Sequence, residues 1–175
     1  MAKTPVCPHC GSKETVDNDS FYTCNACHND FGREALSDDG ESMVTAVKGM
    51  RFRYGDVISG SVRLRFVQDG DVCLYEVYDS YEGGVNKVAG VLDGNAWTKL
   101  KKTLFESLYL MDWDREYIPV NDGREIRGNN EWEFAVAVSM DEEYVYRGVD
   151  AYPAYWNKFM KLVEPFFEEL KKEED

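Results

Sequence analysis

The sequence predicts an α+β protein in which a small cysteine-rich unit precedes an antiparallel β-sheet with two helices packed on one face. Three observations support this prediction. Two Cys-x-x-Cys pairs stand near the N-terminus, several segments alternate apolar and polar residues, and two later segments carry apolar stripes at helical spacing. The chain of 175 residues is long enough for one sizeable domain and a small one.

Four of the five cysteines lie in two Cys-x-x-Cys pairs, at positions 7–10 and 24–27. Thiolates at this spacing are typical ligands of a tetrahedral metal ion. Between the pairs, Glu14–Val16 and Phe21–Thr23 predict two short strands joined by a turn. Such a β-hairpin returns the second pair to the first. Because a hairpin of this size has too little core to fold alone, we expect it to need a metal.

The segments Cys-Pro-His-Cys-Gly-Ser, Tyr-Thr-Cys-Asn-Ala-Cys and a following Phe-Gly resemble a zinc ribbon over roughly residues 5–32. The resemblance implies a β-hairpin with two knuckles and one structural zinc ion, held by Cys7, Cys10, Cys24 and Cys27. A rubredoxin-like iron site uses similar knuckles, so iron stays open as an alternative, as do four unligated cysteines. Such ribbons commonly continue the second knuckle with Gly. Here His28 stands there, and either it or His9 would be the competing ligand.

We place the zinc ribbon at residues 1–35, a linker at 36–42 and the α+β domain at 43–175. The linker is polar and turn-rich, and it is short enough that the two parts should touch. The N-terminus lacks the apolar stretch of a signal peptide, and no run of about 18 apolar residues predicts a membrane span. The expected location is therefore the cytoplasm, where thiolates stay reduced.

The α+β domain is predicted to begin with antiparallel strands, because apolar residues alternate with arginine, serine or other polar residues there. Residues 72–78 follow the turn signal Asp69-Gly70, and their inner face should be Cys73, Tyr75 and Val77. Residues 79–94 predict a loop with one short strand. Strands are expected at 51–54, 61–66, 72–78, 132–138 and 144–149.

Two amphipathic segments predict the helices. The first helix should cover about 95–111, with Asn95 as its cap and the three lysines at 99, 101 and 102 away from its apolar stripe. The second should follow Pro153 and should kink or restart near Pro165. The two stripes comprise Trp97, Leu100, Leu104, Leu108 and Met111, and then Trp156, Phe159, Val163, Phe167 and Leu170.

The formal net charge is −13. Residues 1–36 carry three basic and five acidic side chains, and the remainder carries 17 basic and 28 acidic ones. Phosphate neutralisation supplies most non-specific affinity for nucleic acid, so this balance disfavours a nucleic-acid partner. A protein partner, and a basic one in particular, fits the charge better. The sequence indicates no membrane contact and leaves the oligomeric state open.

The sequence contains no nucleophile elbow, phosphate-binding loop or dinucleotide fingerprint. Both histidines flank the cysteine pairs, so the main domain holds no Ser-His or Cys-His pair of its own. We expect Cys73 to be an inert strand thiol. Asp112, Asp114 and Glu116 alternate as a cation-binding loop would, but a solvated acidic loop is the better interpretation. A metal- or carboxylate-dependent enzyme remains a third class.

Four arginines, at positions 51, 53, 63 and 65, should project from one sheet face if their strands pair. This candidate binding patch of Arg51, Arg53, Arg63 and Arg65 would bind an acidic partner or a phosphate backbone. Pairing with nearby acids is the structural alternative. Likewise, Trp113, Tyr144 and Tyr146 form either an exposed contact surface or core packing under the helices.

The sequence therefore predicts a non-catalytic zinc-binding protein that acts through protein–protein contacts, as an adaptor, regulator or inhibitor. The alternative is a nucleic-acid-related protein. It would either bind directly through the ribbon and the arginine strands, or mimic DNA with its acidic surface and inhibit a nucleic-acid-binding protein.

Overall fold

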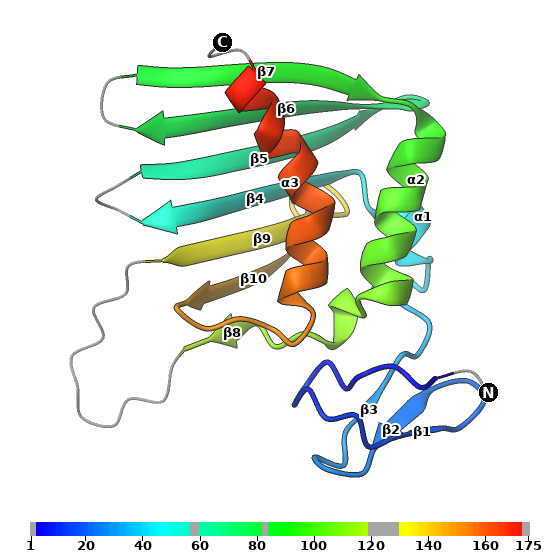
Figure 1. The fold of residues 1–175 in the computed structure, drawn as a ribbon. Helices are drawn as coiled ribbons and strands as arrows, with labels where there is room; N and C mark the ends of the chain where they lie inside the picture. Colours follow the sequence, from blue (N-terminus) through cyan, green and yellow to red (C-terminus); the bar gives the residue numbers. More distant parts are fainter. Residues whose placement is uncertain (1–2, 57–59, 82–83, 119–129, 173–175) are drawn as a thin grey trace.

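A computed structural model describes residues 3–56, 60–81, 84–118 and 130–172. Residues 3–35, called the cysteine unit below, lie against one end of a much larger sheet domain, residues 43–172 (Figure 1). The cysteine unit has a three-stranded sheet of order β1-β2-β3, and the sheet domain has a seven-stranded sheet of order β7-β6-β5-β4-β9-β10-β8. The α+β class predicted from the sequence is confirmed.

The cysteine unit contains the expected hairpin and one further strand: β1 (Thr15–Asp17), β2 (Tyr22–Cys24) and β3 (Asp30–Phe31). The large sheet consists of β4 (Gly49–Asp56), β5 (Gly60–Asp69), β6 (Val72–Tyr81), β7 (Gly84–Leu92), β8 (Glu116–Tyr117), β9 (Glu131–Ala137) and β10 (Glu143–Val149). All its pairings are antiparallel except that of β8 with β10. The helices are α1 (Met43–Ala46), α2 (Gly94–Lys102), the π-helix η1 (Thr103–Ser107), the 3-10 turn η2 (Leu110–Asp112) and α3 (Trp156–Lys172).

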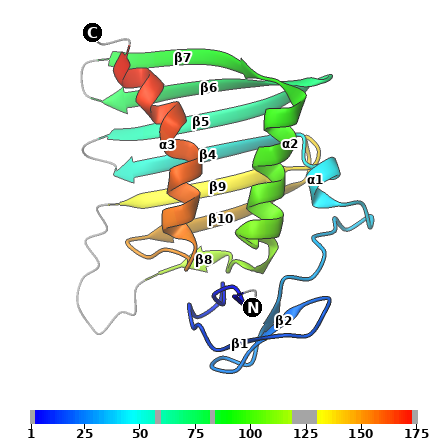
Figure 2. The same cartoon turned by 45° about the vertical axis from the view of Figure 1, so that its right-hand side comes forward.

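Helices α2 and α3 cover the same face of the large sheet, as both views show (Figures 1 and 2). The core between them is largely aromatic. Phe52 of β4 meets Phe159 of α3 with ring centroids 5.0 Å apart, and Phe66 of β5 stacks on Trp97 of α2 at 5.6 Å. The predicted packing of two helices on one face is therefore confirmed. No helix in the described part of the chain is long and apolar enough to span a membrane.

The prediction of a loop with one short strand over residues 79–94 understates the regular structure there. There β6 continues to Tyr81, and β7 forms a full edge strand beside it. The glycines of this segment resemble loop residues, but Gly90 pairs with Tyr75 in the sheet. A Cβ at Gly90 would lie 2.3 Å from the Tyr75 hydroxyl, so the strand needs glycine to admit that ring. The inner face predicted for β6, with Cys73 and Val77 buried, is confirmed.

The first long helix begins and ends differently from the prediction. Asp93, not Asn95, caps α2: its Oδ1 accepts a hydrogen bond of 2.7 Å from the Ala96 N–H. After Lys102 the chain widens into η1, and at Tyr109 it takes a left-handed backbone with φ of 53°. The turn is held by Trp113, whose Nε1 donates to the Leu108 carbonyl at 2.8 Å.

Lys101 is buried, with 4% of its surface exposed, so the prediction that it lies away from the apolar stripe is wrong. Its Nζ donates to the Val47 carbonyl at 3.2 Å and lies 5.0 Å from the centre of the Trp97 ring. Burial lowers the pKa of this ammonium, and the neighbouring charge of Lys48 lowers it further. Periodicity does not reveal this burial, because the butyl stem of lysine packs as an apolar chain.

Helix α3 runs continuously through Pro165, so the helix does not restart there. It begins three residues after Pro153, whose carbonyl accepts from the Trp156 N–H at 3.0 Å. The aromatic residues for which two interpretations stood open belong mainly to the core. Trp113 and Tyr146 are buried and make an edge-on contact at 6.0 Å, whereas Tyr144 is half-buried.

Candidate metal centre

The first knuckle of the cysteine unit is a tight turn closed by backbone hydrogen bonds. The Gly11 N–H donates to the Cys7 carbonyl at 2.9 Å, and the Cys7 N–H donates to the Ser12 carbonyl at 3.0 Å. Gly11 has a φ of 78°, a left-handed conformation that costs glycine little. The glycine after the second cysteine is thus required by the turn.

The second knuckle repeats this geometry with a different residue. The His28 N–H donates to the Cys24 carbonyl at 2.9 Å, and His28 has a φ of 64°. This is the position where zinc ribbons commonly carry Gly, and the backbone shows why glycine suits it. Histidine is one of the residue types that tolerate the left-handed region, at some cost. His28 therefore keeps the bend of the knuckle rather than changing it.

The four cysteines of the two knuckles converge, and their sulfur atoms all lie within 4.8 Å of one another. The two shortest approaches join opposite knuckles: Cys7 Sγ to Cys27 Sγ at 3.7 Å, and Cys10 Sγ to Cys24 Sγ at 3.5 Å. A tetrahedral ion with metal–sulfur bonds of about 2.3 Å requires sulfur–sulfur separations of roughly 3.8 Å. The donor set therefore fits such an ion, and the distances are far beyond the roughly 2.05 Å of a disulfide.

Neither histidine belongs to this group of converging ligand atoms in the described part of the chain. His9 Nδ1 lies 4.0 Å from Asp114 Oδ1, on the side of the sheet domain. Two of the thiols are buried, Cys7 and Cys24, while Cys10 is exposed at the surface. The centre is therefore a four-sulfur site at the edge of the cysteine unit.

The protein environment acts differently on the two buried thiols. Burial raises the pKa of Cys7 to about 12. The backbone N–H groups of Cys27 and Ala26 point at the Cys24 sulfur and lower its pKa to about 7. A divalent cation offsets the repulsion between four thiolates, so metal binding must be accompanied by proton release.

The cysteine unit has a very small hydrophobic core, and an aromatic side chain of the sheet domain packs against it. The hydrophobic cluster of the unit has Cys7, Cys24 and Phe31 as buried members, and Pro8 is the one further buried residue among residues 3–35. Tyr109, from the left-handed turn before η2, packs edge-on against Phe31 at 5.3 Å and against Tyr22 at 6.5 Å. The contact continues into the sheet domain, where Tyr109 meets Tyr155 at 5.7 Å. Sequence periodicity did not indicate this contact, because Tyr109 lies outside the predicted apolar stripe and its left-handed φ cannot be read from the pattern.

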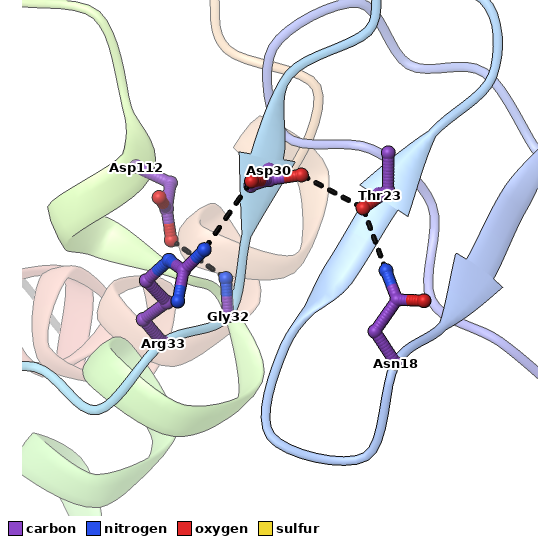
Figure 3. A network of polar contacts seen from close by, with 6 residues as sticks. All are labelled: Asn18, Thr23, Asp30, Gly32, Arg33 and Asp112. Atoms are coloured by element: carbon purple, nitrogen blue, oxygen red, sulfur yellow. Dashed lines mark hydrogen bonds and ion pairs between the residues drawn. The ribbon is translucent and has the colours of Figure 1, made fainter.

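Polar contacts also join the two parts, so the expectation that they touch is confirmed. Asp112 Oδ2 accepts a hydrogen bond of 3.1 Å from the Gly32 N–H, and the Tyr155 hydroxyl donates to the Val6 carbonyl (Figure 3 shows the Asp112 contact). Burial raises the pKa of Asp112, partly offset by that N–H. Asp112 is therefore a docking residue. It is not grouped with Asp114 and Glu116 as a cation site in the described part of the chain.

A second network stiffens the cysteine unit on its outer side. Asn18 Nδ2 donates to the Thr23 hydroxyl at 2.7 Å, and that hydroxyl donates to Asp30 Oδ1 at 2.7 Å (Figure 3). Arg33 then forms an ion pair with Asp30 at 3.3 Å. Gly32, between them, has a φ of 79°, and a Cβ there would lie 3.0 Å from Tyr22. Glycine is therefore required at position 32, directly after β3, where the chain turns toward the sheet domain.

The four candidate arginines lie on the sheet face opposite the helices. Arg51 pairs with Arg65, and Arg53 pairs with Arg63, in directly opposed positions of β4 and β5. Their neighbours Phe52 and Leu64 are buried beneath the helices, so alternation turns the arginines to the other side. Like charges directly opposite one another destabilise a sheet, which makes this arrangement costly unless acids or a partner neutralise it.

Acidic neighbours neutralise only part of this charge. Arg51 forms ion pairs with Glu133 and Glu143, and Glu133 has a lowered pKa because Arg51 offsets the effect of its burial. Arg63 lies 5.9 Å from the ring centre of Tyr78. For Arg53 and Arg65, no hydrogen bond or ion pair of the guanidinium group occurs among the described residues.

Cys73 is fully buried in β6, and burial raises its pKa to about 11, so the thiol is neutral at neutral pH. It lies outside the four-sulfur group.

Comparisons with protein-family models, with curated proteins and with solved structures give no match to this chain. Its function has to be argued from its own residues.

Proposed function

We propose that this chain is a zinc-binding protein that acts through protein–protein contacts, and that its zinc is structural. The observation that carries the proposal is the convergence of Cys7, Cys10, Cys24 and Cys27 with sulfur separations close to those of a tetrahedral thiolate site. Four thiolates complete the coordination of zinc and leave no position for water or substrate. Such an ion stabilises a fold and does not activate a reactant.

The proposal gives the zinc a defined role in the architecture. The ion holds a unit that has almost no core, and that unit packs against Tyr109 and Tyr155 of the sheet domain. The knuckle geometry resembles both zinc and iron sites, since their metal–sulfur bonds are similar in length. Zinc is favoured because a structural role needs no redox change.

A second candidate function, direct nucleic-acid binding through the cysteine unit and the arginine strands, is favoured by the opposed arginine pairs. The acidic side chains among them and the net charge of −13 weigh against it.

Elemental analysis of the protein purified without added metal tests the proposal. We expect one zinc per chain, and Cys24→Ser should lose it, whereas the control Cys73→Ser should keep it. Iron with the absorption of a thiolate–iron site, or no metal in the native protein, would contradict the proposal. So would turnover of any substrate abolished by one carboxylate substitution in the sheet domain.

A further inference from the structure

The large sheet has one face without a covering element in the described part of the chain. Helices α2 and α3 both lie on the other side (Figures 1 and 2). The uncovered side holds a hollow of ≈ 810 Å³ whose lining includes Arg53, Arg63, Arg65, Tyr78 and Met140. We call this side the arginine face. It is large enough to accept a ligand that spans several strands.

Strand register arranges the side chains of the arginine face in rows across the sheet. One row runs over six strands, from β7 to β10, and consists of Lys87, Tyr78, Arg63, Arg53, Glu133 and Arg147. The next row consists of Ala89, Glu76, Arg65, Arg51, Ala135 and Val145. Together they hold six basic side chains against two acidic ones, on a protein whose net charge is −13. The local charge therefore opposes the charge of the whole molecule.

The acids on this face leave several cations available. Glu133 and Glu143 are both engaged by Arg51, and Glu76 forms an ion pair with Lys87 at 3.1 Å. In the described residues, the guanidinium groups of Arg53, Arg65 and Arg147 form no hydrogen bond or ion pair with an acid. Glu133 lies opposite Arg53 and Arg147 in the sheet, and their charges help to lower its pKa, but Arg51 is the arginine that forms an ion pair with it. The opposed pair of Arg53 and Arg63 costs the isolated sheet stability. A site that carries such a cost is explained if an anionic ligand neutralises it.

A third row makes the same face apolar at one side. It contains Val91 of β7, Leu74 of β6 and Val67 of β5, which lie side by side on neighbouring strands. Their exposed fractions are 61%, 41% and 42%, respectively. An apolar strip beside the row that holds Arg65 and Arg51 fits a ligand that carries both carboxylates and apolar side chains. A phosphodiester backbone offers no such apolar side chains.

From this arrangement we infer that the arginine face binds an acidic, partly apolar segment of a partner protein, laid across the strands of the large sheet. Arg53, Arg63 and Arg65 bind its carboxylates, and Val67, Leu74 and Val91 contact its apolar side chains. The inference rests on the proposed role in protein–protein contacts, and it names the surface and the chemistry of the partner. The overall negative charge points to basic partners, whereas this face selects acidic ones.

The test measures binding of a fluorescein-labelled peptide to the zinc-loaded full chain by fluorescence anisotropy. The peptide has about ten residues, in which glutamate alternates with leucine, enough to cross several strands. Arg53→Gln combined with Arg63→Gln should weaken binding by about tenfold or more, since two charge-assisted contacts are lost. The matched control combines Lys99→Gln with Lys102→Gln, two exposed lysines of α2 on the other side of the sheet, and should change the affinity less than about twofold. Arg65→Gln is the second variant, with an expected loss of about threefold.

Several results would overturn the inference. They are the absence of peptide binding, equal binding of a peptide with glutamine in place of glutamate, and equal losses in the two double variants. Tighter binding of a thymidine oligonucleotide of the same length would assign the face to nucleic acid. Self-association abolished by the arginine variants would assign it to a second copy of the chain. Zinc content is measured on the same samples, so loss of the peptide site is distinguished from failure of the zinc proposal.

Discussion

The cysteine unit and the sheet domain reach a stable fold by different means. The sheet domain buries a continuous aromatic core, in which Phe52, Phe134 and Phe159 meet at ring distances between 4.9 and 6.2 Å. The cysteine unit buries two cysteines, Pro8 and Phe31 among its described residues, and completes its packing with Tyr109 from the other part. We therefore expect residues 3–35 to depend on a metal and on the neighbouring sheet domain, and the sheet domain to fold without either.

The largest expected effect is that of removing one thiolate. Cys24→Ser should abolish zinc binding, which contributes on the order of 10 kcal/mol to the folding of such a unit. Residues 5–32 should become sensitive to protease, while the sheet domain keeps a cooperative thermal transition. Cys73→Ser is the matched control and should retain both zinc and protection. Loss of the whole fold in Cys24→Ser would mean that the cysteine unit belongs to the main core.

Removing the shared aromatic ring should have the next largest effect. Tyr109→Ala should lower the free energy of unfolding by about 3 kcal/mol, because it leaves a cavity between Phe31 and Tyr155. Urea denaturation measures the change. Tyr109→Phe keeps the ring in the same left-handed turn and should cost less than about 1 kcal/mol. Equal stability of the alanine variant and the wild type would show that the two parts fold independently.

Removing the hydroxyl of two different tyrosines should change the free energy of unfolding in opposite directions. The Tyr155 hydroxyl donates to the Val6 carbonyl across the contact between the two parts, so Tyr155→Phe should cost about 1 kcal/mol. The buried Tyr146 hydroxyl has no hydrogen-bond partner among the described residues, so Tyr146→Phe should stabilise by about 1 kcal/mol. Thermal denaturation of the two variants side by side measures both effects. The same sign in both would contradict the assignment of these hydroxyls.

The smallest effect concerns the backbone of the second knuckle. His28→Gly should stabilise the zinc-bound unit by about 1 kcal/mol, because glycine adopts the φ of 64° without steric cost. His28→Ala removes the imidazole but keeps the strain, so it should show no such gain. Competition with a zinc chelator measures both variants. Weaker zinc binding in both would instead identify His28 as a ligand.

Much of the fold could be predicted because the signals are local. The hairpin between the knuckles and the alternating strands β4, β5, β9 and β10 follow from periodicity and turn residues. The length of the edge strand β7 was underestimated because its glycines look like loop residues, although Gly90 is needed to admit the Tyr75 ring. The end of the helix before Tyr109 was not predicted, because a left-handed φ does not alter the spacing of apolar residues.

The candidate functional residues likewise fall into those that could be predicted from the sequence and those that depend on tertiary structure. Spacing alone identified the four cysteines that the fold brings together, because metal knuckles are short and self-contained. The contacts of the arginines depend on strand register, which sets Arg53 against Arg63 and places Arg51 within reach of Glu133 and Glu143. The burial of Lys101 depends on the packing of α2 against Val47, which only the tertiary structure defines.

Hydrogen exchange of the full chain, before and after a chelator removes the zinc, measures whether residues 5–32 depend on the metal. The backbone amides of residues 5–32, including those of β1 and β2, should lose their protection once the metal is removed. Those of β4, β5 and β9 in the middle of the large sheet should keep theirs. Unchanged protection in residues 5–32 would show that no metal is needed there. Loss of protection throughout the sheet would show that the two parts share one core. Either result would contradict a cysteine unit that alone depends on the metal.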